Sequence, residues 1–122
     1  MPEPLAVFFG AWAEMPDEER SATLASCLAP DAVYADPRSG APLTGIEKIA
    51  AYVGQFSANA PGWTAAVVSS DTHFDVTRAL ISFQGPGPNG QEMTQHGTYF
   101  VDHAATGMLS RLVGFVGKEP PA

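Results

Sequence analysis

The spacing of apolar residues changes once along this chain of 122 residues, at Trp63. Up to that point apolar residues recur every three or four positions, which is typical of helices with one buried face. Beyond it, β-branched and aromatic residues alternate with polar ones between turn signals, which is typical of strands. The predicted strands cover residues 64–73, 77–84, 91–102 and 108–116. Helices followed by antiparallel strands predict an α+β fold, with the helices against one face of a mostly antiparallel sheet.

Three helices are predicted before the change of period. The first covers residues 5–12, and the second runs from Asp17 to about Leu28, with acidic residues in its first turn, where the helix dipole favours negative charge. The third follows Thr44, which is expected to cap it, and shows the clearest amphipathic pattern of the chain. A short strand at residues 32–36, closed by a proline, separates the second helix from the third.

Charge and length restrict the function. Acidic residues outnumber basic ones by 13 to 6, the net charge is -7, and the basic residues are scattered. Nucleic-acid binding depends on clustered Lys and Arg, so no nucleic-acid partner is expected. The apolar stretch at residues 5–13 is shorter than the ~20 residues that cross a bilayer, and no secretion signal is evident, so a cytoplasmic protein without membrane contact is expected. One domain over residues 1–122 is predicted, with residues 118–122 as a frayed tail.

Cys27 is the only cysteine, which excludes an intrachain disulfide and a cysteine zinc cage. Its neighbours predict a buried helical thiol, and a reactive thiol is the alternative. No Gly-rich phosphate loop or nucleotide fingerprint is present, so no organic cofactor is expected. Asp36, His73 and His96 lack tight ligand spacing, so no metal site is predicted.

Four segments carry a resemblance to a known family. Residues 28–37 read LAPDAVYADP and residues 45–52 read GIEKIAAY, followed by GTYFVD at 97–102 and GMLSRLVGF at 107–115. In this order and spacing they resemble the SnoaL-like branch of the NTF2-like superfamily, over nearly the whole chain. The resemblance implies a cone in which N-terminal helices pack on a strongly curved sheet and enclose an apolar pocket. It also implies a homodimer formed through the outer face of the sheet.

Ketosteroid isomerases, which belong to the same superfamily, allow a comparison residue by residue. Their general-base aspartate matches Asp36, in the step Asp36-Pro37. Their oxyanion-binding tyrosine falls near Phe8 or Phe9, which carry no hydroxyl, and their protonated acid falls near Gly97, which has no side chain. One such donor contributes roughly 3 to 4 kcal/mol to transition-state stabilisation. Steroid isomerisation is therefore not expected.

Asp36 is the first candidate catalytic residue, because the resemblance places it in the pocket beside apolar side chains, where desolvation makes a carboxylate a stronger base. The alternative is an aspartate that caps the Asp-Pro turn. His73 and His96 are the candidate assistants, since imidazole titrates near neutrality. Together with Tyr34 or Tyr99, this set is similar to that of the dehydratase members of the family. The alternative for both histidines is an exposed position, and strict alternation places His96 opposite Tyr99.

Seven residues are predicted to bind the substrate, mostly through aromatic surface. Arg111 is in phase with Leu109 and Phe115 and is expected to reach into the pocket, where it would hold an oxyanion or a carboxylate. An ion pair with Asp102 or Glu92 is the alternative. The set is Trp12, Tyr34, Tyr52, Phe56, Tyr99, Arg111 and Phe115.

These observations predict a pocket protein that binds a small apolar or aromatic molecule. Proton-transfer chemistry on that molecule, such as cyclisation, isomerisation or dehydration, is expected with Asp36 as the base. The alternative is a non-catalytic ligand carrier or dimeric accessory domain that uses the same cavity. The expected homodimer agrees with apolar residues such as Leu80 and Leu112, which the alternating pattern assigns to the outer sheet face.

Overall fold

The computed structural model describes residues 3–116, and the fold is described for these residues. Every predicted helix and strand is found, with ends shifted by a few residues. The frayed tail expected at residues 118–122 lies outside the described residues. The helices are α1 (Pro4–Gly10), α2 (Asp17–Cys27) and α3 (Ile46–Asn59). The strands are β1 (Leu28–Ala35), β2 (Leu43–Thr44), β3 (Thr64–His73), β4 (Val76–Pro86), β5 (Glu92–His103) and β6 (Leu109–Val116).

Each helix buries one face, made of residues three or four apart. In α2 the buried face includes Arg20 in place of Ala22, which was expected to be buried and is exposed. No helix in the described part of the chain is long and apolar enough to cross a membrane. Cys27 ends the buried face of α2 at 1% exposure, and burial raises the pKa of its thiol to about 11. The buried residues are Leu5, Phe8 and Phe9 in α1, Arg20, Leu24 and Cys27 in α2, and Ile49, Val53 and Ser57 in α3.

The prediction that Thr44 caps α3 is wrong. Gly45 is the N-cap, with φ at 96°, and no side chain caps this helix end. Glycine adopts positive φ without the steric cost that a Cβ would add. Thr44 instead pairs with Val33 in the short β1–β2 ladder.

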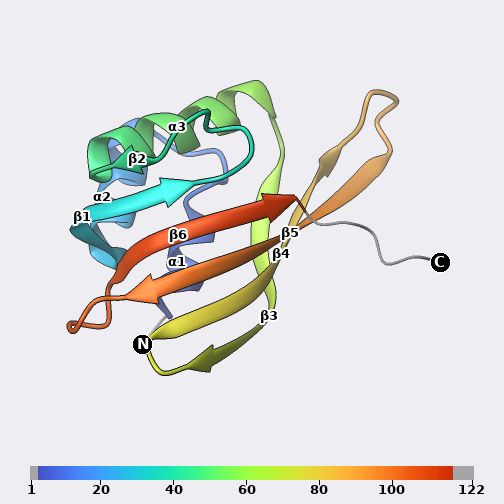
Figure 1. Ribbon diagram of the computed structural model, residues 1–122. Helices are drawn as coiled ribbons and strands as arrows, with labels where there is room; N and C mark the ends of the chain where they lie inside the picture. The colour runs from blue at the N-terminus through green and yellow to red at the C-terminus, as the bar shows by residue number, and fades with distance from the viewer. Residues whose placement is uncertain (1–2, 117–122) are drawn as a thin grey trace.

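The six strands form one mixed sheet in the order β2-β1-β6-β5-β4-β3 (Figure 1). All neighbouring strands are antiparallel except β1 and β6, which run parallel. This one parallel pair brings the first long strand of the chain beside the last. The end of β1 consequently lies next to the C-terminal hairpin, where Ala35 pairs with Val113 although the two are far apart in the sequence.

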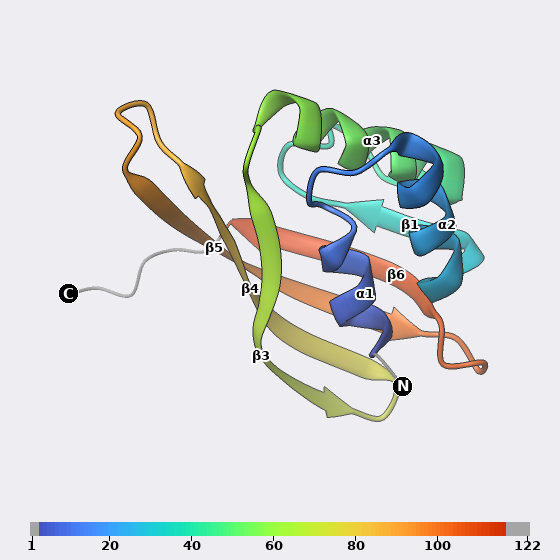
Figure 2. The same ribbon diagram turned by 180° about the vertical axis from the view of Figure 1, so that it is seen from behind.

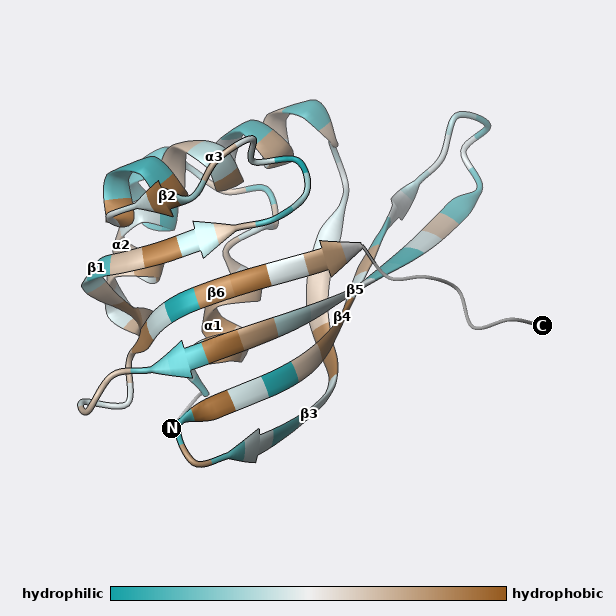
Figure 3. Cartoon of the chain, in the orientation of Figure 1, coloured by the Kyte–Doolittle hydropathy of each residue, from teal (hydrophilic) through white to brown (hydrophobic). Residues whose placement is uncertain are grey.

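The helices cover one face of the sheet, which curves around them (Figure 2). A register shift between Val67 and Ser69 marks an irregularity of the kind that bends a strand, and there β3 turns along α1. Buried residues alternate with more exposed ones over residues 76–81 of β4 and 97–101 of β5, because successive residues face the helices and the outside in turn. Figure 3 shows apolar and polar bands along these strands. Leu80 lies outward as expected, whereas Leu112 is fully buried on the inner face.

Candidate active site

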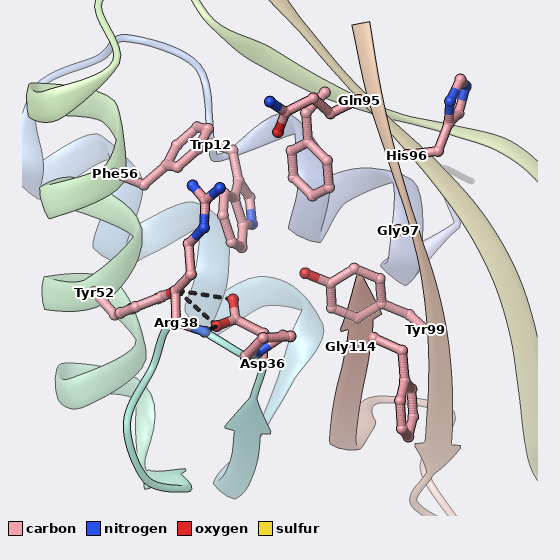
Figure 4. A pocket seen from close by; sticks show the side chains of 13 residues that line it. Trp12, Asp36, Arg38, Tyr52, Phe56, Gln95, His96, Gly97, Tyr99 and Gly114 are labelled. Atoms are coloured by element: carbon pink, nitrogen blue, oxygen red, sulfur yellow. Dashed lines mark hydrogen bonds between the residues drawn. The ribbon is translucent and has the colours of Figure 1, made fainter. Parts of the chain in front are cut away.

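A pocket of about 110 Å³ opens between α3 and the inner face of the sheet (Figure 4). Its walls come from six parts of the chain: the segment after α1, the turn after β1, helix α3, and the strands β4, β5 and β6. The lining residues are Trp12, Asp36, Pro37, Arg38, Tyr52, Phe56, Phe83, Gln95, His96, Gly97, Tyr99, Gly114 and Phe115.

Asp36 follows the last residue of β1, where Pro37 prevents further pairing, and its side chain is half-buried. One carboxylate oxygen, Oδ1, accepts a hydrogen bond from the backbone N–H of Arg38 at 2.8 Å. This is the turn-capping bond that the sequence offered as the alternative to catalysis. The cap occupies only part of the carboxylate, whose remaining acceptor capacity faces side chains of the pocket.

Two phenols donate to the same carboxylate. The Tyr34 hydroxyl lies 2.6 Å from Oδ2 of Asp36, and the Tyr52 hydroxyl lies 2.8 Å from each of its oxygens. A third phenol extends the network, because the hydroxyls of Tyr34 and Tyr99 are 2.7 Å apart. An ionised carboxylate only accepts hydrogen bonds, so the single proton of Tyr34 is directed to Asp36, and Tyr99 donates to Tyr34. The result is a row of bonds that runs from Tyr99 through Tyr34 to Asp36.

The three tyrosines of the Asp36 network, Tyr34, Tyr52 and Tyr99, are uncharged at neutral pH. Burial, followed by the nearby Tyr99 and Asp36, raises the pKa of Tyr34 well above its ordinary value of 10.0. Burial is also the main cause of the raised pKa of Tyr52 and of Tyr99. Since deprotonation would place a second negative charge beside Asp36, each phenol is held in the form that donates a hydrogen bond.

Aromatic rings form most of the wall opposite Asp36. The Trp12 ring packs edge-to-face on Phe56 with centroids 4.9 Å apart, and on Phe83 at 5.7 Å. Tyr99 requires a glycine beside it, because a Cβ on Gly114 would lie 2.5 Å from its ring. The wall therefore offers flat apolar surface around a single carboxylate.

The positions that correspond to the oxyanion donors of ketosteroid isomerases carry no donor. Phe8 and Phe9 are fully buried, where Phe8 packs on Tyr34 at 5.7 Å and Phe9 on Tyr99 at 5.0 Å. Gly97 lies in the pocket wall without a side chain. Any oxygen that gains charge in this pocket needs hydrogen bonds from other groups.

Of the predicted substrate-binding residues, Trp12, Tyr52, Phe56 and Tyr99 line the pocket. Phe115 borders it as well, but its side chain is 54% exposed and packs on Phe100, on the outer face of the sheet. Tyr34 lies behind the wall, where it is fully buried and is not among the lining residues.

The two histidines lie away from the carboxylate network. His73 is at the end of β3, outside the pocket, with its side chain 82% exposed beside Asp71. His96 reaches the pocket rim but is exposed, and it projects from β5 on the side opposite Tyr99. Neither histidine is in contact with Asp36. Tyrosine hydroxyls contact the carboxylate, where an imidazole was expected from the sequence.

Arg111 does not reach the pocket, contrary to the expectation from alternation. It is exposed on the outer face of β6, directly across from Asp102, and forms no ion pair with any described residue. The register of β5 and β6 shifts between Asp102 and His103, so Leu109 and Leu112, three residues apart, are both buried. That shift places Arg111 on the opposite face.

Arg38 and Gln95 line the pocket and were not identified from the sequence. The Arg38 guanidinium points away from Asp36, toward Phe56 and Trp12, and has no ion-pair partner in residues 3–116 (Figure 4). Its position directly after Asp36-Pro37 was the available signal, because a turn there carries the next side chain to the pocket mouth. Within the same residues, His, Cys, Asp and Glu form no group that could hold a metal ion.

The chain is similar to known proteins both in sequence and in fold. A family model for the SnoaL-like domain matches residues 8–112. None of the curated proteins matches the chain. A SnoaL-like protein from Agrobacterium tumefaciens strain C58, described as a candidate isomerase, superposes with a TM-score of 0.79 at 24% identity, over 94% of this chain and 95% of that one.

Two similar structures contain small organic molecules. A protein of ketosteroid isomerase-like fold from Catenulispora acidiphila, in complex with trimethylamine, has a TM-score of 0.77 at 15% identity, covering 96% of this chain and 87% of its own. TerC, co-crystallised with polyporic acid, has a TM-score of 0.72 at 14% identity, with 93% and 87% covered. At these identities the likeness concerns the fold.

Proposed function

Since this chain belongs to the SnoaL-like domain family, we propose that its pocket binds a compact apolar or aromatic molecule and that Asp36 removes a proton from it. Loss of that proton is the first step of an isomerisation, cyclisation or dehydration. The observation that carries the proposal is the Asp36 carboxylate, which lies in an aromatic pocket and accepts bonds from the Tyr34 and Tyr52 hydroxyls. No bound cofactor is needed for this step.

The size and lining of the pocket support a small ligand. A dry protein cavity of about 150 Å³ holds benzene, so an interior of about 110 Å³ suits one small ring. A longer molecule would extend through the mouth past Arg38. Similar folds hold trimethylamine and polyporic acid, which are also small organic molecules.

Proton uptake by Asp36 would reverse the row of phenols. A neutral Asp36 can donate to Tyr34, Tyr34 then donates to Tyr99, and the Tyr99 hydrogen turns toward the pocket. Each tyrosine has one hydroxyl proton before and after the reversal, and the only proton gained is the one that Asp36 has taken from the substrate. The freed Tyr99 hydroxyl would bind the substrate oxygen that receives the electron pair of the broken C–H bond. Abstraction and stabilisation of the product would thus be linked through Tyr34.

The replacement of Asp36 by Asn tests the proposal. Compact ketones that raise the melting temperature of the protein are incubated in D2O, and NMR follows the exchange of hydrogen next to the carbonyl. Asp36→Asn should lower the protein-dependent exchange rate by about a hundredfold without loss of binding. Asp71→Asn, which alters an exposed carboxylate paired with Arg78, should leave the rate unchanged. Exchange by Asp36→Asn at the unmodified rate would reduce the pocket to a binding site.

We also propose that the protein forms a homodimer through the outer face of its sheet. Phe100 and Phe115 are 43% and 54% exposed there and pack edge-to-face, with ring centroids 5.8 Å apart. Val68 adds a third exposed apolar side chain on β3. Burial of such side chains against a second copy would remove apolar surface from water.

A further inference from the structure

The indole N–H of Trp12 is a buried donor without an acceptor. Trp12 is 2% exposed and lines the pocket, and among the described residues no group accepts a hydrogen bond from its Nε1. A buried donor without a partner costs about 1–3 kcal/mol. Native proteins rarely retain such a group without a reason, and one in a pocket wall suggests a ligand atom as its partner.

The indole is held in this orientation from several sides. Its ring contacts Phe56 and Phe83 edge-to-face, and Tyr52 at 6.2 Å. Arg20 holds the backbone on both sides of Trp12, because its Nε donates to the Ala11 carbonyl and its Nη2 to the Ala13 carbonyl, each at 3.0 Å. A ring fixed in this way cannot turn its N–H to solvent or to a backbone oxygen without disturbing its neighbours.

We propose that the Trp12 indole N–H binds an oxygen atom of the ligand, so that the pocket selects compact molecules with an acceptor oxygen over hydrocarbons of the same shape. Indole N–H is a donor only, so cations and hydroxyl hydrogens cannot satisfy it. A carbonyl oxygen can, and it would share the pocket with Asp36 and the Tyr99 hydroxyl, toward which Trp12 faces in Figure 4. The inference rests on the proposed pocket function, and it adds the group that recognises the ligand.

This donor would take the place of those that the ketosteroid isomerase comparison finds missing. Phe8, Phe9 and Gly97 supply no hydrogen bond to a ligand oxygen, whereas Trp12 belongs to the pocket wall and its Nε1 has no acceptor among the described residues. In the proposed reaction Trp12 binds the oxygen from the outset, while Tyr99 becomes a donor only after Asp36 has taken up the proton. A donor that is already in place loses little entropy when charge develops.

The first test uses NMR on the unmodified protein, with cyclohexanone and methylenecyclohexane as probes of nearly equal shape. The chain has two tryptophans, and Trp63 provides an internal reference because its Nε1 already donates to the Pro86 carbonyl at 3.2 Å. Cyclohexanone should move the Trp12 indole proton to lower field and leave that of Trp63 in place. Methylenecyclohexane should produce no such shift. Equal effects of the two probes on Trp12 would overturn the inference.

The second test compares affinities. In Trp12→Phe the preference for cyclohexanone over methylenecyclohexane, expressed as a ratio of dissociation constants, should fall about tenfold relative to the unmodified protein. Trp63→Phe removes the other indole of the chain, which does not line the pocket, and should keep the ratio. An unchanged ratio in Trp12→Phe would reject the donor role. Asp36→Asn should also keep the ratio, so failure of the proposed base and failure of the Trp12 inference give different results.

Discussion

At the scale of single residues, the pocket is organised by one carboxylate and three phenols. Tyr34, Tyr52 and Tyr99 are all the tyrosines of the chain, and each belongs to the Asp36 network. Their hydroxyls could not be buried at this density without the acceptor that Asp36 provides. The same bonds fix the direction in which each proton points. Asp36 therefore has a structural role in the turn and in the network, together with the chemical role proposed for it.

The raised pKa values of the tyrosines predict how the free energy of unfolding changes at alkaline pH. The folded-state pKa of Tyr34 is raised above 10.0. Its contribution to the free energy of unfolding is therefore complete below pH 10 and is lost as the pH rises further. Denaturant unfolding should show a free energy that falls above pH 10, by about 1.4 kcal/mol per pH unit for each such group. Tyr34→Phe should be less stable below pH 10 and lose stability less steeply above it. A phenolate absorbance that appears in the folded protein near pH 10 would contradict this account.

At the scale of secondary-structure elements, the parallel pairing of β1 with β6 positions the site. It brings Asp36, at the end of β1, close to Gly114 on β6, and Tyr99 follows on the adjacent strand β5. Helix α3 then closes the pocket with Tyr52 and Phe56. Residues from distant parts of the sequence meet because the first long strand adds to the edge of the C-terminal hairpin.

Replacement of Gly114 by alanine tests this close approach of β6 to Tyr99. In Gly114→Ala the new Cβ would lie 2.5 Å from the Tyr99 ring, so the ring has to move and its bond to Tyr34 is strained. We expect a loss of about 1–3 kcal/mol in the free energy of unfolding. Gly10→Ala is the matched control, because Gly10 ends helix α1 with open space around it and no positive φ, and its replacement should cause no loss of stability. Comparable stability of Gly114→Ala and the unmodified protein would refute the packing described.

Periodicity alone predicted most of these elements, including β3 from Thr64 to His73. It could not predict which strands become neighbours, since strand order is decided by long-range packing. Arg111 illustrates the consequence, because a register shift in the β5–β6 pair puts it on the face opposite Leu109, while Phe115, which is in phase with it, is exposed as well. Asp36 was identified from the sequence and lies in the pocket wall, whereas Trp12 was expected to bind the substrate through its aromatic surface and not through its N–H. Its unpaired N–H depends on the positions of all surrounding acceptors, which no local pattern encodes.

At the scale of the whole molecule, the sheet presents two different faces. The inner face holds the aromatic core and the pocket, and the outer face exposes Val68, Phe100 and Phe115 around polar residues. Curvature of the sheet encloses the first face and leaves the second open. One sheet could in this way serve both ligand binding and association with a second copy.

The proposed dimer is tested by the molar mass in solution. Light scattering at micromolar concentration should give twice the mass of the chain, and Phe100→Glu should give the single mass, because a charge would be buried in the interface. Phe74→Glu is the matched control: Phe74 is 100% exposed at the β3–β4 turn, and its replacement should leave the dimer intact. A single mass for the unmodified protein would exclude the dimer.

The proposed function requires a ligand that lies against Asp36. The most direct measurement is a crystal structure of the protein with a ketone that undergoes Asp36-dependent exchange. The account predicts the ketone in the aromatic pocket, with its oxygen within hydrogen-bonding distance of Trp12 Nε1 and its exchanging carbon in contact with the Asp36 carboxylate. A ketone bound elsewhere, or one whose exchanging carbon faces away from Asp36, would contradict it.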